Sequence, residues 1–150
     1  MVFLQRIFVL IFGLFSLVIF FKGFWESTKK KNAYGETPFL VLMGIFVWGD
    51  AVVFGLFWFF SSWLTLLLNN WILFCLIFSV FWVVRSLGET VFWFNQQFSS
   101  IKRYPPETLR GYRFFKNDAI WFVYQIICQC VTIISLITSL YLAKLWLKTV

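Results

Sequence analysis

An almost uninterrupted apolar run from Phe39 to Val84 is the feature that most constrains how this chain can fold. One helix crosses the roughly 30 Å of hydrocarbon in a bilayer with about 20 residues. The run is more than twice that long, so it predicts two crossings joined by a tight turn. We expect the turn between Ser61 and Asn70, where the polar pairs Ser-Ser and Asn-Asn lie close to tryptophans suited to the headgroup level.

The composition agrees with a membrane setting. Hydrophobic residues make up 61% of the chain, aromatic residues 24% and charged residues only 13%, whereas globular domains are about half apolar and a quarter charged. A water-soluble core of this size could not hide 22 Phe and 9 Trp. In lipid, apolar side chains can face outward while helices satisfy their own backbone hydrogen bonds. The expected fold class is therefore all-α, a polytopic membrane protein with a four-transmembrane-helix bundle as one domain over residues 1–150.

We expect the four spans near residues 2–23, 38–60, 70–94 and 117–142. The first run could be mistaken for a signal peptide, but Lys22-Gly23-Phe24-Trp25-Glu26 lacks the small residues of a cleavage site, which favours a mature helix. Pro38 suits the first turn of the second helix.

Lys and Arg residues are unevenly distributed over the connections. Four lie in residues 22–37 and five in residues 95–116, against none in the Ser/Asn turn and three near the termini. The positive-inside rule places both basic connections in the cytoplasm and both termini outside. The third connection is also a candidate for binding anionic lipid headgroups, through Lys102, Arg103, Arg110, Arg113 and Lys116.

Ionisable residues within the spans are the main functional candidates. Asp50 lies twelve residues after Pro38, or about 18 Å along a continuous helix and near the midplane. A charge there costs about 2.5–3.5 kcal/mol or more, so it should face the bundle interior. Arg85 and Glu89 share one face of the third span, which extends to Gln96. We expect an Asp50–Arg85 ion pair, with Glu89 as a second partner.

The fourth span carries polar residues at intervals of seven, a spacing that keeps one helix face toward a partner. They are Asp118, Gln125, Thr132 and Ser139, with Gln129 on nearly the same side. Such residues either hydrogen-bond neighbouring helices, at about 0.6–2 kcal/mol each, or line a pathway. The first interpretation is favoured.

The sequence offers little for catalysis. Histidine is absent, which removes the commonest ligand of transition metals and the commonest general base. Cys75, Cys128 and Cys130 lie in apolar runs, where thiols behave as small hydrophobes. Redox, nucleotide-binding and hydrolase motifs are also missing. We expect no cofactor and no metal. Enzymatic work on lipid is the least favoured class of function, because without histidine its acid/base groups would have to be Asp50, Glu89 and Asp118.

Two other classes of function are favoured over an enzyme. The leading hypothesis is an oligomeric channel or transporter for an ion or small solute, with Asp50, Arg85 and Glu89 lining a polar route opposite Gln125 and Gln129. The alternative is a non-catalytic structural subunit, assembly factor or immunity-type protein of a membrane complex. Membrane lipids, and further copies or other chains, are the expected partners. Nucleic acid is not, because the basic residues lie beside hydrophobic spans.

Overall fold

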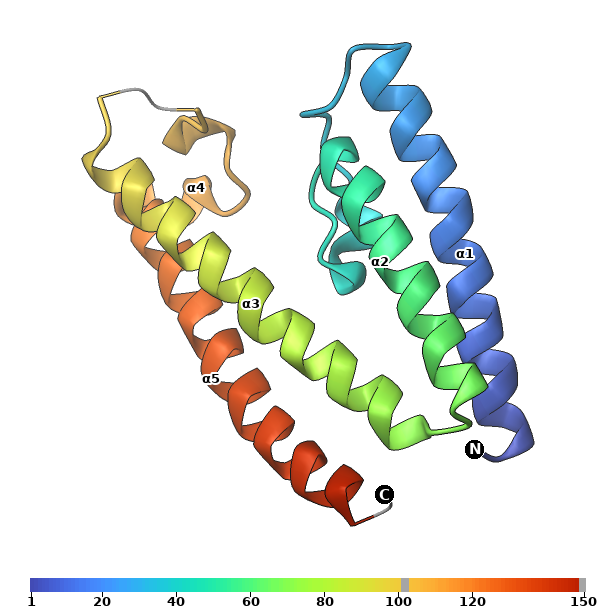
Figure 1. Ribbon diagram of the computed structural model, residues 1–150. Helices are drawn as coiled ribbons and strands as arrows, with labels where there is room; N and C mark the ends of the chain where they lie inside the picture. The colour runs from blue at the N-terminus through green and yellow to red at the C-terminus, as the bar shows by residue number, and fades with distance from the viewer. Residues whose placement is uncertain (101–102, 149–150) are drawn as a thin grey trace. The chain divides into compact units, whose positions relative to one another are not determined.

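Four long helices dominate the computed structural model, which describes residues 1–100 and 103–148 (Figure 1). They are α1 (Phe3–Thr28), α2 (Trp48–Leu67), α3 (Trp71–Phe98) and α5 (Ala119–Leu147). Each is long and apolar enough to cross a membrane, by length and composition. Three short helices lie in the connections: η1 (Pro38–Met43), η2 (Pro106–Thr108) and α4 (Tyr112–Phe115). The all-helical prediction is confirmed over the described residues, whose β-pairing is limited to a bridge between Glu36 and Val47.

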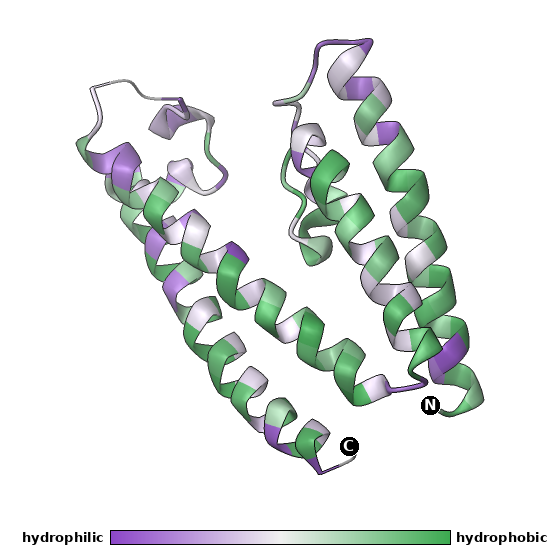
Figure 2. Cartoon of the chain, in the orientation of Figure 1, coloured by the Kyte–Doolittle hydropathy of each residue, from purple (hydrophilic) through white to green (hydrophobic). Residues whose placement is uncertain are grey.

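Hydrophobic residues cover most of the four long helices, and hydrophilic residues concentrate in the connections (Figure 2). The turn between α2 and α3 falls at residues 68–70, at the end of the expected window. Asn69 adopts a left-handed conformation with φ 49°, which Asn tolerates better than most residues. The side chain of Asn70 accepts a hydrogen bond from the Leu73 amide at 3.0 Å, capping α3.

Residues Met1–Ile77 form one compact unit in which α1 and α2 pack as an antiparallel pair. Small residues allow the close approach. A Cβ added to Gly23 would lie 2.6 Å from the Cβ of Ala51, and one added to Gly55 would lie 2.9 Å from the backbone of Phe20. The ring of Phe12 meets the fully buried Trp58 edge-on, with ring centroids 5.5 Å apart.

The second span differs from the prediction. Pro38 does begin a helix, but it is the 3-10 helix η1, which ends at Met43. Gly44 then reverses the chain direction with a left-handed φ of 71°, a conformation that glycine adopts without steric cost. The α-helix starts only at Trp48. Asp50 therefore lies in the first turn of α2, and the continuous helix from Pro38, along which its depth of about 18 Å was counted, is not formed.

Residues Phe78–Val150 form the second compact unit, and the division falls within α3. Here α3 and α5 run antiparallel, because Ser79 bonds to Ser139 and Gln97 bonds to Gln125. A small apolar cluster closes one end of the pair, with Trp93 on α3 and Ile120 and Trp121 on α5. Tyr104 and Tyr112 of the connecting segment pack against it.

Candidate functional site

Asp50 is engaged with the backbone just before its own helix. Its Oδ2 atom accepts hydrogen bonds from the amides of Phe46 at 3.0 Å and Val47 at 3.4 Å. Amides at a helix start have no partner within the helix, and the positive end of the helix dipole favours a carboxylate there. The carboxylate thus fixes the start of α2.

Arg85 and Glu89 form the ion pair expected from their spacing on α3. The Arg85 Nη1 and Glu89 Oε1 atoms are 2.8 Å apart, and the two side chains are 16% and 17% exposed. Asp50 belongs to the other compact unit, so its pairing with Arg85 stays a prediction.

A row of hydrogen bonds joins α3 to α5, and we call its members the α3–α5 seam: Ser79, Ser86, Gln97, Gln125, Thr132 and Ser139. The hydroxyls of Ser79 and Ser139 are 2.9 Å apart, and Ser79 also donates to the Ser135 carbonyl at 2.8 Å. Ser86 and Thr132 are bonded at 2.8 Å. Gln97 Nε2 donates to Gln125 Oε1 at 2.6 Å.

The seam includes three of the polar residues predicted at intervals of seven on the fourth span, namely Gln125, Thr132 and Ser139. Asp118 is instead exposed at the start of α5, and its side chain makes no capping bond. Gln129 is half-buried. Sequence reasoning missed the seam residues of α3, although Ser79 and Ser86 are also seven residues apart, a signal that could have found them.

Gln96 has a structural role that its position on the Arg85 face did not predict. It is 5% exposed, and its Oε1 atom accepts hydrogen bonds from the amides of Arg103 at 3.1 Å and Tyr104 at 3.3 Å. The Trp121 indole donates to the Tyr104 carbonyl at 3.0 Å, and the Tyr124 hydroxyl donates to the Arg110 carbonyl at 3.2 Å. These bonds hold the connecting segment against the ends of α3 and α5.

That segment presents its basic side chains outward. The exposed cations are Arg103, Arg110, Arg113 and Lys116, whereas Lys102 lies outside the described residues. The guanidinium of Arg113 lies 4.8 Å from the ring centroid of Phe114, which is 73% exposed. Cations beside exposed aromatic rings suit a membrane–water interface.

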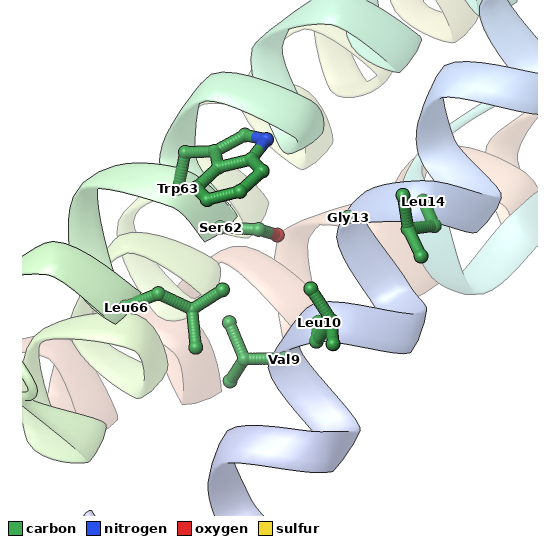
Figure 3. A pocket seen from close by; sticks show the side chains of 7 residues that line it. All are labelled: Val9, Leu10, Gly13, Leu14, Ser62, Trp63 and Leu66. Atoms are coloured by element: carbon green, nitrogen blue, oxygen red, sulfur yellow. The ribbon is translucent and has the colours of Figure 1, made fainter.

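A shallow crevice lies between α1 and α2 (Figure 3). Its lining is apolar apart from Ser62, and it is too narrow to hold a water molecule. The Ser62 hydroxyl is buried there and has no hydrogen-bond partner among the described residues. Within the part of the chain that the structure describes, no group of three or more Cys, Asp or Glu residues could hold a metal ion, and all three cysteines are free.

Comparison of the chain with protein-family models, curated proteins and solved structures finds no match.

The seam makes a testable prediction about packing. We expect Gln125→Leu to destabilise the protein by about 0.5–1.5 kcal/mol, the usual range for one hydrogen bond between helices in a membrane. Gln129→Leu on the same helix is the matched control and should have little effect, because no hydrogen bond of the Gln129 side chain is seen among the described residues. Reversible unfolding in mixed micelles measures both. Equal losses for the two variants would contradict a specific role for the Gln97–Gln125 bond.

Proposed function

We propose that the chain is a multi-pass membrane protein whose long helices form a bundle, and that it serves as a non-catalytic subunit or assembly factor of a membrane complex. The observation that supports this is how its polar groups are used. Asp50 bonds to backbone amides, and the seam side chains bond to one another across α3 and α5. These groups stabilise the chain itself, which suits a protein that acts through packing.

Isolation of the protein from its native membranes in a mild detergent tests the proposal. We expect at least one other chain at a constant ratio through two successive chromatographic steps. Exchange of the mild detergent for a harsher one should dissociate the other chain from this protein. Recovery of nothing but copies of this chain would contradict the subunit role.

An oligomeric channel or transporter for an ion or small solute is the second candidate, and the Arg85–Glu89 pair favours it. Ionisable residues within membrane spans are functional candidates by default, because their burial is costly. Both side chains are about one-sixth exposed, so an ion could compete for the pair. Purified protein in liposomes should then show a flux of an ion or small solute across the membrane, and Glu89→Gln should abolish this flux. An absence of flux from the wild type, or a flux that both Glu89→Gln and Asp50→Asn leave unchanged, would remove this candidate.

We further propose that residues 22–37 and 95–116 face the cytoplasm and that both termini lie outside. The excess of Lys and Arg in these two connections supports this orientation. The Arg6 Nε atom donates to the Asn69 side chain at 3.1 Å, so the start of α1 and the α2–α3 turn lie at the same end of their unit. Alkaline phosphatase fused to the C-terminus should be active, and an inactive but stable fusion would reverse the orientation.

The exposed basic side chains of residues 103–116 are also expected to bind anionic phospholipid headgroups. Near a charged membrane surface each Lys or Arg contributes about 1 kcal/mol. Replacing Arg103, Arg110, Arg113 and Lys116 with Gln should therefore reduce retention of phosphatidylglycerol at least tenfold, measured by native mass spectrometry of protein released from nanodiscs. Replacement of Lys29, Lys30 and Lys31 is the control for general charge. An equal reduction in the control would show that net charge, and not this segment, retains the lipid.

A further inference from the structure

The second part of the segment between the first two long helices is apolar and folds back along α2. Residues 37–49 contain no charged side chain. Leu40, Met43 and Ile45 are buried, with exposures of 2%, 4% and 0%, whereas Phe39 and Leu42 are 66% and 78% exposed. The segment thus has an apolar inner face on the protein and an apolar outer face. We call residues 38–47 the returning segment.

Two contacts show how far the returning segment extends along α2. The Lys22 ammonium lies 5.9 Å from the ring centroid of Phe39 and 4.9 Å from that of Trp48, so Phe39 is level with the start of the helix. The Trp58 indole donates to the Met43 carbonyl at 2.9 Å. Trp58 lies about 15 Å along the helix from Trp48, and its side chain points back toward the helix start. The Met43 carbonyl therefore lies beside α2, roughly 10 Å along the helix axis from Trp48. From there the chain returns to the start of α2 at Trp48.

Three side chains bond to backbone groups of the returning segment. The Thr37 hydroxyl donates to the Ile45 carbonyl at 3.0 Å, and the Trp58 indole donates to the Met43 carbonyl. The Asp50 carboxylate accepts hydrogen bonds from the amides of Phe46 and Val47. Further bonds lie within the segment and its flank, namely Thr37 N to Phe46 O, Leu40 N to Thr37 O and Gly44 N to Val41 O. Irregular backbone is tolerated at membrane depth where its polar groups are satisfied by protein. These bonds meet that condition for the groups they join.

We infer that the returning segment is a re-entrant membrane loop, whose outer residues Phe39 and Leu42 contact lipid acyl chains. It enters and leaves the bilayer on the side of residues 29–37. The inference rests on the membrane location proposed above and is independent of the choice between subunit and transporter. It also gives Asp50 a role: the carboxylate secures the point where the loop rejoins α2.

Depth measurement by electron paramagnetic resonance tests the loop. The native Cys75, Cys128 and Cys130 are first replaced with Ser, and single cysteines are then introduced by Leu42→Cys, Val53→Cys and Lys30→Cys. Val53 is 64% exposed on α2 and provides the membrane reference, and Lys30 provides the aqueous reference. Each variant is spin-labelled and reconstituted in phosphatidylcholine vesicles. Collision rates with oxygen and with a nickel chelate are then compared.

The oxygen-to-nickel ratio at Leu42 is expected to approach that at Val53 and to exceed that at Lys30 several-fold. A ratio at Leu42 equal to that at Lys30 would overturn the inference. A label at Leu42 that neither reagent reaches would also overturn it, because protein would then cover the outer face. Failure of the membrane location itself is distinguishable, since Val53 would become accessible to nickel.

Phe39→Cys provides a second site in case the Leu42 variant does not fold, as judged by circular dichroism and gel filtration. Phe39 lies level with Trp48, so its label should be shallower than the one at Leu42 and deeper than the one at Lys30. A label at Phe39 as accessible to nickel as the one at Lys30 would contradict entry into the bilayer.

Discussion

Gly55→Leu is expected to disrupt the packing of α1 against α2 and to destabilise the protein by about 3 kcal/mol, because overpacking of this kind costs typically 1–3 kcal/mol and occasionally more. A Cβ at Gly55 would lie 2.9 Å from the backbone of Phe20, which cannot rotate away as a flexible side chain could. The helices must therefore separate. Reversible unfolding in mixed micelles, followed by circular dichroism, measures the change.

Gly88 on α3 provides the matched control, because a Cβ added there would meet no atom of the described residues within 4 Å. Gly88→Leu should not destabilise the protein, because leucine is nearly as good a helix former as alanine. Gly88→Ala should raise the free energy of unfolding by about 0.5–1 kcal/mol, because alanine loses less backbone entropy than glycine when a helix forms. Similar losses at Gly55 and Gly88 would mean that helical conformation, and not the close approach to Phe20, decides the outcome.

Asp50→Ala is expected to destabilise the protein by about 2–3 kcal/mol, because it leaves the amides of Phe46 and Val47 without their acceptor in a half-buried site. Asp50→Asn should lower the stability by less than half as much, because the asparagine amide oxygen can still accept a hydrogen bond from the amides of Phe46 and Val47. The same unfolding measurement applies.

The control for Asp50 is Asp118→Ala. Asp118 precedes α5 and is exposed, with no capping bond from its side chain, so its loss should change stability by less than about 0.5 kcal/mol, as for ordinary surface substitutions. Equal effects of the two alanine variants would contradict the role given to Asp50. If Asp50→Asn were as damaging as Asp50→Ala, the negative charge itself would matter, and the predicted pairing with Arg85 would gain support.

Hydropathy and spacing predicted much of this architecture. Four long apolar helices, the turn at residues 68–70 and the pairing of Arg85 with Glu89 follow from rules that act along one helix. The seam residues on α5 could be found because a seven-residue spacing keeps them on one face. Their partners are a property of two helices together, and only the structure identifies Gln97 for Gln125.

The returning segment could not be found in this way. A hydropathy sum over residues 38–60 is the same whether the chain forms one helix or a 3-10 turn followed by a later helix. The distinguishing signal was local, in Gly44 followed by Ile45 and Val47, a turn residue before β-branched residues. Gln96 was likewise placed correctly on α3, but its role as an acceptor for the Arg103 and Tyr104 amides could not be predicted, because that role depends on how the connection after α3 folds back.

The hydrogen bonds described for the returning segment have a consequence for biogenesis. All of them join residues within Met1–Ile77, so none requires any part of the chain that a ribosome synthesises later. Pauses or truncations after residue 77 should leave these bonds able to form, whereas the seam must wait until α5 has been delivered. The order of synthesis thus allows the first half of the chain to mature before the second.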